Sequence, residues 1–503
     1  MTTINSQNID YKTVVDVAKG EKVNIGPKAR KLIVKTRDAL EKEVKLGSVI
    51  YGVTTGFGMF KNKSISGDEV RQLQRNLILS HSVGVGKPFE KKVVRAMMFL
   101  MANYLSKGHS GVRLLVVRTL VEMLNKGVHP IIPEKGSVGS SGDLAPSAHL
   151  ILVMIGEGEA EFRGQIMTGR VAMHKAKIKI VELEAKEGLA LINNTSAMTA
   201  NAVLAIEDVT NLVNIADICG SLSSEALRAT LNAFSELIHD IKPHPGQIEV
   251  AKRMRYLLTG SKTLDTTKVQ DQYSIRCIPQ IHGAVRGALN YATEVVNIEA
   301  NSVTDNPLIF FDKDDNTVVL SGGNFHGESV AMAMDTLGMA ICEIANISDR
   351  RIASLLDPAN SNGLPAFLVE KGGLNSGMMI LQYATAALVS ENKILAHPAV
   401  VDSIPTSANV EDLVSMGTIS ARKAREIIEN VKNVLAIELM VAAQAIDFRL
   451  KSGFTLGQKT NQIFKMIRTV VPFFATDSIY YPYTKKLVEL INSNNFAIIL
   501  NYD

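Results

Sequence analysis

Apolar residues in the second half of the chain follow the period of an α-helix. Between Glu328 and Leu356 they recur at intervals of three and four residues, and the stripe consists of Val330, Met334, Leu337, Ile341, Ile344 and Ile347. Such spacing places all of them on one helix face. Residues 421–448 contain no glycine or proline, which allows a single helix of about 40 Å. These patterns predict long helices packed in a bundle.

The first 200 residues have a different pattern, in which short apolar segments alternate with many glycines. We expect an N-terminal globular domain over residues 1–200 and a long helical bundle with C-terminal helices over residues 201–503. The predicted fold class is therefore mainly α. With 503 residues, of which 46% are hydrophobic, the chain is long for one core and can bury a large apolar interior.

Charge and cysteine content restrict the classes of partner. The net charge is +4, from 54 basic and 50 acidic residues, which gives no reason to expect nucleic acid or a membrane as partner. The three cysteines, Cys219, Cys277 and Cys342, are too far apart to form a metal-ligand motif. We expect a reducing, cytoplasmic compartment and no metal, no secretory signal in the polar segment Met1–Asp10, and no membrane span.

A glycine-rich stretch, Gly136–Pro146, is followed directly by an apolar run. A flexible linker would lead into polar sequence, so we interpret this stretch as a tight functional turn. A phosphate-binding loop requires a lysine that is missing here, and Asp143 would repel phosphate. A nucleophile elbow requires glycines at fixed offsets on both sides of the serine, and neither Ser140 nor Ser141 has them.

The sequence Ser140-Ser141-Gly142 is suited to an internal cyclisation. Gly142 has no side chain, so its amide nitrogen can approach the carbonyl carbon of Ser140 and close a ring. Elimination of the Ser141 hydroxyl then leaves an exocyclic methylidene, which is a strong electrophile. The backbone would supply this electrophile without any external cofactor.

The stretch resembles the prosthetic-group motif of the aromatic amino acid ammonia-lyase and aminomutase family. That family carries 4-methylidene-imidazol-5-one (MIO), usually formed from Ala-Ser-Gly, and Ser140 stands here in place of the alanine. The departure is mild because the first residue contributes only backbone atoms to the ring. The resemblance therefore implies an MIO group formed from Ser140, Ser141 and Gly142.

Further segments resemble the family's motifs in the family's order, and together they cover about Tyr51–Met416. They are Tyr51–Gly58, Ser80-His81, Gly188–Thr195, Gln270–Arg276, Gly322–His326 and Ser390–Lys393. The resemblance implies the long-helix architecture that the family shares with fumarases and aspartases. It also implies a homotetramer in which each active site draws on more than one chain.

The resemblance assigns roles to individual residues in these segments. Tyr51 is the expected catalytic base, and Ser141 supplies the methylidene. Arg276 is expected to hold the substrate carboxylate with two parallel hydrogen bonds, and Asn193 adds a substrate contact. Near the prosthetic ring we expect Gln270 and Tyr273, the latter as a second candidate for catalysis, with Phe325 as a wall of the pocket.

His81 and Glu391 favour histidine as the substrate. Ser80-His81 lies where the family reads the substrate ring, and Ser390–Lys393 resembles its histidine-specific branch. A phenyl ring would leave both polar groups unpaired, whereas an imidazole can pair with both. We therefore expect conversion of L-histidine to trans-urocanate and ammonia. The alternatives are a 2,3-aminomutase, a tyrosine or phenylalanine ammonia-lyase on the same scaffold, and a non-catalytic relative that binds a ligand or partner.

Two further positions depart from the family's pattern. Leu413, within Thr406–Met416, lies where histidine-specific members usually have histidine, which implies either a different pocket edge or a dispensable histidine. Asn194 replaces the glycine of the family's Leu-Asn-Gly-Thr segment. If that position needs left-handed backbone, asparagine is the side chain that tolerates it best.

Overall fold

The computed structural model describes residues 1–66, 69–493, 495–496 and 499, and the chain divides into two compact units. The first unit comprises Met1–Ala205, Ala292–Asp335 and Pro398–Arg422, and the second comprises Ile206–Tyr291, Thr336–His397 and Lys423–Asp503. Two later segments thus join the N-terminal residues in the first unit. The expected domains, residues 1–200 and 201–503, stay a prediction.

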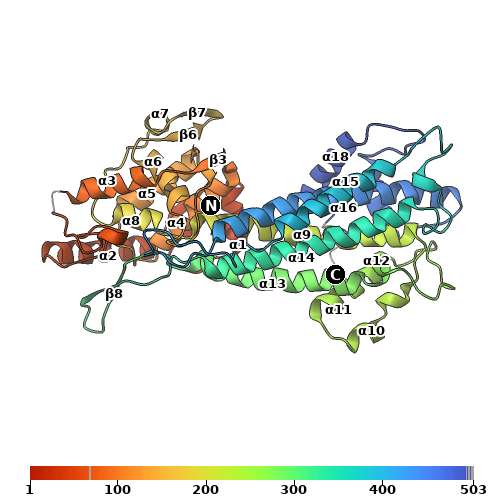
Figure 1. The fold of residues 1–503 in the computed structure, drawn as a ribbon, viewed down its shortest axis with the longest axis horizontal. Coiled ribbons are helices and arrows are strands. Elements are labelled where there is room, and N and C mark those ends of the chain that lie inside the picture. The colour runs from red at the N-terminus through yellow and green to blue at the C-terminus, as the bar shows by residue number, and fades with distance from the viewer. Residues whose placement is uncertain (67–68, 494, 497–498, 500–503) are drawn as a thin grey trace. The chain divides into compact units, whose positions relative to one another are not determined.

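Helices dominate the described residues (Figure 1), which confirms the predicted mainly α fold class. The helices up to residue 226 are α1 (Tyr11–Ala18), α2 (Pro27–Lys45), α3 (Val70–His81), α4 (Lys91–Leu105), α5 (Leu114–Lys126), α6 (Leu144–Met154), α7 (Gly169–Lys175), α8 (Glu187–Ile192) and α9 (Ser196–Ala226). The later helices are α10 (Glu236–Asp240), α11 (Pro245–Leu257), α12 (Tyr273–Arg276), α13 (Ile278–Asn301), α14 (Glu328–Leu356), α15 (Met379–Leu395), α16 (Gly417–Lys451), α17 (Gln458–Arg468) and α18 (Tyr481–Asn492).

The strands are short and belong to the first unit. They are β1 (Thr2–Ile4), β2 (Val23–Ile25), β3 (Val85–Pro88), β4 (Val128–Pro130), β5 (Pro133–Lys135), β6 (Glu159–Phe162), β7 (Gln165–Thr168), β8 (Leu308–Phe311) and β9 (Thr317–Leu320). β1 and β2 pair in parallel, whereas the pairs β3–β5 and β8–β9 and the sheet β4–β6–β7 are antiparallel. In the β8–β9 hairpin, Ile309 lies opposite Val319.

The core of the first unit is built around α4, whose residues Val93–Leu105 are all buried. A helix with apolar residues on every face belongs in the interior of a domain. α4 packs on α1 and α5, and α6 packs on α3 and α8. Because α6 is apolar and largely buried, the glycine-rich stretch before it leads straight into this core.

The second unit is a bundle of long helices. The ribbons of α9, α14 and α16 run side by side (Figure 1), and buried polar side chains join them. Glu438 on α16 accepts hydrogen bonds of 2.6 and 2.8 Å from Arg351 on α14. Ser223 on α9 and Ser348 on α14 donate to the same carboxylate at 2.6 and 2.5 Å. A buried carboxylate is costly unless it is paired, so these contacts fix how the three helices align.

The two helical patterns in the sequence are confirmed. α14 spans Glu328–Leu356, and every residue of the predicted stripe is buried. α16 contains the whole segment without glycine or proline and begins and ends a few residues outside it. By length and composition, α14 is also the one helix of the described residues that could cross a membrane. However, 67% of its apolar window is buried inside the fold, as expected for a core helix.

Candidate active site

The glycine-rich stretch runs from the end of β5 to the start of α6, and segments distant in sequence hold it in place. The Met416 amide donates to the Val138 carbonyl at 2.8 Å. The Gly139 carbonyl accepts bonds from the Gly327 amide at 3.1 Å and the Ser415 hydroxyl at 2.8 Å. The loop is therefore fixed by residues that are distant from it in sequence, such as Ser415, which follows Gly139 by 276 residues.

Asp143, at the start of α6, is fully buried and anchors the loop from inside. Its carboxylate accepts hydrogen bonds from the Met198 amide at 2.7 Å, the Ser137 hydroxyl at 2.9 Å and the Thr418 hydroxyl. Burial raises the pKa of Asp143, and these three donors oppose that rise. They belong to the first turns of α9 and α16 and to the loop itself, so one carboxylate joins three segments.

Gly142 occupies a place that no other residue fits. Its φ is +73°, and a Cβ there would lie 2.2 Å from the Asn194 carbonyl oxygen. The Asp143 amide donates to that same oxygen at 2.6 Å. Asn193, which ends α8, donates from Nδ2 to the Ser141 carbonyl oxygen at 2.8 Å. The segment after α8 thus holds the backbone of Ser141 and Gly142.

The hydroxyls of Ser140 and Ser141 both donate to the carboxylate of Glu411. The Ser141 bond is 2.8 Å long, and Ser140 bonds the other oxygen. Thr406 donates to that second oxygen at 3.2 Å. Sequence reasoning missed Glu411, although it lies two residues before the singled-out Leu413. A carboxylate this close to the proposed electrophile can accept a proton there.

Tyr51 lies in a loop of the first unit, and its ring is partly buried. The Gly58 amide donates to the Tyr51 phenol oxygen at 3.1 Å. The ring of Phe57 meets that of Tyr51 edge to face, with centroids 6.4 Å apart. The Gly58 amide and the Phe57 ring therefore fix the orientation of the Tyr51 side chain.

His81 is the last residue of α3, and its Nδ1 lies 3.0 Å from the Ser80 hydroxyl. Burial lowers the pKa of His81, against opposing effects of the Leu77 backbone and the negative charge of Glu411. The imidazole is therefore mainly neutral at pH 7. A neutral imidazole carries one donor and one acceptor nitrogen, so it can pair with a polar ring of a ligand.

One cavity of ≈1010 Å³ in the first unit brings the predicted residues together. Its lining includes the predicted residues Tyr51, His81, Ser140, Ser141, Asn193 and Phe325, together with Glu411, which was not predicted. These residues come from six separate segments of the chain. Gly142, the remaining predicted site residue of this unit, is buried and is not part of the lining, although its neighbour Ser141 is.

The four remaining predicted residues belong to the second unit. Arg276 donates to Gln270 and stacks its guanidinium over the ring of Tyr273, with 4.8 Å to the centroid. Tyr273 is 71% exposed. Glu391 is also exposed and accepts a 3.0 Å hydrogen bond from Asn430. Gln270 is exposed as well, whereas Arg276 is partly buried, and none of the four residues is part of the lining of the cavity in the first unit.

The structure shows the surroundings of Asn194 and Leu413, which depart from the family's pattern. Asn194 is not among the residues with positive φ, so the left-handed backbone considered for this position is not needed. Its buried amide instead donates to the Leu191 carbonyl at 3.0 Å and accepts from the Ser196 amide at 2.9 Å, which links α8 to α9. Leu413 lines the cavity and is 63% exposed. Leu413 therefore makes this part of the cavity's edge apolar.

Comparison with known proteins identifies the family. The profile described as aromatic amino acid lyase matches residues 9–469, which is most of the chain. The chain belongs to the aromatic amino acid lyase family. Within the part of the chain that the structure describes, no three His, Cys, Asp or Glu side chains are grouped as metal ligands would be.

Named relatives and solved structures are similar to this chain over nearly its full length. A protein named histidine ammonia-lyase 2 from Fusobacterium nucleatum subsp. nucleatum is 53% identical over 501 residues, covering 99% of this chain and 97% of the relative. The crystal structure of histidine ammonia-lyase from Trypanosoma cruzi has a TM-score of 0.92 at 39% identity, covering 99% of this chain and 94% of that one. Tyrosine aminomutase from Streptomyces globisporus has a TM-score of 0.94 at 34% identity, covering 99% and 98%.

Proposed function

We propose that this lyase converts L-histidine to trans-urocanate and ammonia, using an MIO group formed from Ser140, Ser141 and Gly142. The observation that carries the proposal is the cavity, where Ser141 lies with Tyr51, His81, Asn193 and Glu411. The family and the relatives named histidine ammonia-lyase, similar over nearly the full chain, support it.

The residues of the loop fit the MIO group. Ring closure joins the Gly142 nitrogen to the Ser140 carbonyl carbon, and the Ser140 oxygen leaves as water. Ser141 then loses its hydroxyl and its α-proton as a second water. Gly142 is held with no room for a side chain, and Asn193 binds the Ser141 carbonyl oxygen, which remains after closure. When formed, the group supplies an electrophile that takes up the amine of the substrate.

Tyr51 and Glu411 are the proton acceptors that we assign in the first unit. Tyr51 removes the β-proton of the substrate, and the Gly58 amide already donates to its oxygen. A hydrogen bond of this kind strengthens when the acceptor becomes charged. Glu411 lies at the Ser141 hydroxyl and is placed to accept a proton from the substrate's ammonium. The two groups lie on different segments of the cavity wall and can serve separate protons.

Binding of the substrate requires a partner for its carboxylate. Arg276 is our candidate because a guanidinium binds a carboxylate with two parallel hydrogen bonds. Arg276 contacts both Gln270 and Tyr273 in the second unit, and Tyr273 is largely exposed. We propose a cytoplasmic homotetramer in which these residues, with Glu391, complete the site of another copy. Phe325 provides an aromatic wall to the cavity.

His81 and Glu391 direct our choice of histidine over tyrosine and phenylalanine. The neutral His81 ring lines the cavity and needs a polar partner when the site is closed to water. An imidazole offers one, and a phenyl ring does not. Because a tyrosine aminomutase has the same fold, an aminomutase that returns the amine to the β-carbon is the second candidate.

A substrate panel tests the proposal. Purified protein is incubated separately with histidine, tyrosine and phenylalanine, and the unsaturated acid is followed by its ultraviolet absorbance. We expect rapid product formation with histidine alone. Faster reaction with tyrosine or phenylalanine, or no reaction with any of the three, would contradict the proposal.

A further inference from the structure

Gln74 joins two segments of the candidate site without lining the cavity itself. It lies on α3, is fully buried, and is absent from the lining of the cavity. Its Nε2 donates to the Gly52 carbonyl at 3.0 Å, and its Oε1 accepts from the Leu189 amide at 3.2 Å. Because a carbonyl can only accept and an amide can only donate, these partners fix which way the side-chain amide points.

Close packing leaves little room for movement around these hydrogen bonds. A Cβ on Gly188 would lie 2.7 Å from the Gln74 carbonyl oxygen, and a Cβ on Gly52 would lie 2.5 Å from Leu189 Cδ2. α3 and α8 therefore approach each other at backbone distance, and the Leu189 side chain packs directly on the Tyr51 loop at Gly52. Gln74 is the side chain that hydrogen-bonds the other two segments from α3.

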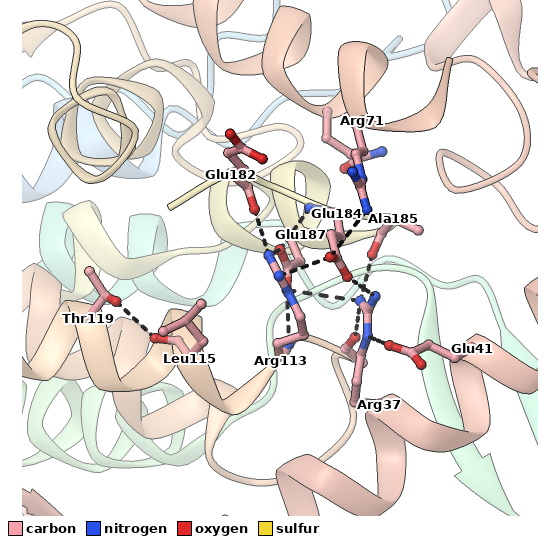
Figure 2. Close-up of polar contacts among 12 residues, drawn as sticks. Arg37, Glu41, Arg71, Arg113, Leu115, Thr119, Glu182, Glu184, Ala185 and Glu187 are labelled. Carbon is pink, nitrogen blue, oxygen red and sulfur yellow. Dashed lines mark hydrogen bonds and ion pairs between the residues drawn. The ribbon is translucent and has the colours of Figure 1, made fainter. Parts of the chain in front are cut away.

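The α8 side of this contact is firmly anchored. Glu187, the first residue of α8, is fully buried, and Figure 2 shows Arg113 pointing toward it. Arg113 donates to this carboxylate from its amide at 3.0 Å, from Nε at 2.8 Å and from Nη2 at 2.7 Å. These bonds raise the pKa of Arg113, although burial opposes the rise. Arg37 adds a bond of 2.9 Å to Glu184, just before the helix.

The other end of α8 carries Asn193, which binds the Ser141 carbonyl oxygen. α8 is thus held at its start by ion pairs and at its end by the loop that contains Ser141. Tyr51, in contrast, precedes Gly52, whose carbonyl is bound by Gln74. A change at residue 74 is therefore expected to displace the Tyr51 loop more than α8.

We infer that Gln74 is a positioning residue that sets Tyr51 relative to Ser141. It acts through the Gly52 carbonyl on one side and the anchored α8 on the other. The inference rests on the proposed function, in which Tyr51 removes a proton. It predicts that a change at Gln74 lowers kcat by more than a loss of stability alone would explain. The reason is that an error of about 1 Å in the position of a catalytic group can cost about 10²-fold in rate.

The test compares Gln74→Met with Gln444→Met. Gln444 is a matched control in the second unit, because it is equally buried and its amide also bonds only backbone groups. We expect both variants to lose stability, but only Gln74→Met to lose kcat, by about 10²-fold with KM little changed. Near-ultraviolet absorbance of the prosthetic group should persist in both, since α8 still holds the loop at Ser141.

Hydrogen exchange followed by mass spectrometry provides a readout that does not depend on turnover. In Gln74→Met, the peptide covering Tyr51–Gly58 should exchange faster than in the wild type, and the peptide covering α8 should not. Gln444→Met should leave both peptides unchanged. Equal losses of kcat in the two variants, or unchanged exchange over Tyr51–Gly58, would overturn the inference. If the wild type did not act on histidine, the proposed function would fail, and the exchange result would still decide what Gln74 holds.

Gln74→Glu keeps the inference testable if Gln74→Met does not fold. A protonated carboxyl can donate to the Gly52 carbonyl and accept from the Leu189 amide, whereas a carboxylate cannot donate. Burial raises the pKa of such a group, so the neutral form is favoured at the acid end of the pH range. We expect the ratio of variant to wild-type kcat to fall as pH rises. A ratio that is independent of pH would contradict the inference.

Discussion

Gly142 lies against the backbone of Asn194 so closely that a Cβ would stand 2.2 Å from the Asn194 carbonyl oxygen. The φ of +73° at Gly142 is a second reason for glycine at this position. The proposed ring requires the nitrogen of this residue. The close packing against Asn194 and the proposed ring closure therefore both depend on Gly142.

Gly142→Ala should abolish both the prosthetic group and the activity, because the added methyl displaces the loop from Asn193 and Asn194. Intact mass and near-ultraviolet absorbance measure the loss of the two waters directly. Gly287→Ala is the control, since a Cβ there meets nothing within 4 Å. A Gly142→Ala protein that still lacks two waters relative to its sequence would contradict this account of the loop.

Ser141→Ala and Ser140→Ala should behave differently. Both hydroxyls bond Glu411, but only the Ser141 hydroxyl must leave to form the methylidene. Ser141→Ala should fold, lose the near-ultraviolet chromophore and lose nearly all activity, whereas Ser140→Ala should keep both. An inactive Ser140→Ala protein without chromophore would mean that the extra hydroxyl is needed for maturation.

Tyr51→Phe should retain the chromophore and lose turnover. A positioned general base typically contributes about 10²–10⁴-fold, and the substitution removes the oxygen that Gly58 binds. Tyr481→Phe serves as the control, because Tyr481 is 66% exposed and lies outside the cavity lining. A loss of only a few-fold in Tyr51→Phe would favour Tyr273 as the base.

Glu411→Gln should lower kcat by about 10²–10⁴-fold while the chromophore is retained. Glutamine keeps an oxygen that can accept from the Ser141 hydroxyl, but it cannot take up a proton at neutral pH. Absorbance and turnover of the same preparation separate maturation from catalysis. Loss of the chromophore in proportion to the loss of activity would place Glu411 in maturation instead.

The double substitution His81→Leu with Glu391→Met should remove the penalty that the wild-type site imposes on substrates with apolar rings. A site built to hydrogen-bond its substrate rejects an analogue that lacks the partner atoms by roughly 10⁴–10⁵-fold. The kcat/KM for histidine should fall sharply, and that for phenylalanine should fall far less or rise. If both substrates lose kcat/KM in equal proportion, the two residues support the machinery and do not read the ring.

Local pattern was sufficient to predict the long helices. The stripe on α14 and the uninterrupted segment of α16 each depend on the spacing of neighbours within one element. The motifs likewise identified Tyr51, His81, Ser141, Asn193 and Phe325, all of which line one cavity. Their roles come from the resemblance of these short segments to the family's motifs, which can be recognised without knowledge of this chain's fold.

Contacts between segments that are distant in sequence could not be predicted from local sequence patterns. Nothing near Gln74 in the sequence indicates that its amide bonds both Gly52 and Leu189. Glu411 cannot be recognised from its own segment, because its partners Ser140 and Ser141 lie about 270 residues earlier. The local sequence at Asn194 indicates only a question of backbone tolerance, whereas its side chain links α8 to α9 at ordinary φ. Such roles depend on tertiary structure.

The most direct measurement of the proposed reaction is proton nuclear magnetic resonance of purified protein incubated with L-histidine. The expected result is trans-urocanate and ammonia formed in equal amounts as histidine disappears, and no product with the Ser141→Ala protein. A β-amino acid as the main product would identify an aminomutase. Histidine left unchanged by a protein that carries the chromophore would contradict the proposed substrate.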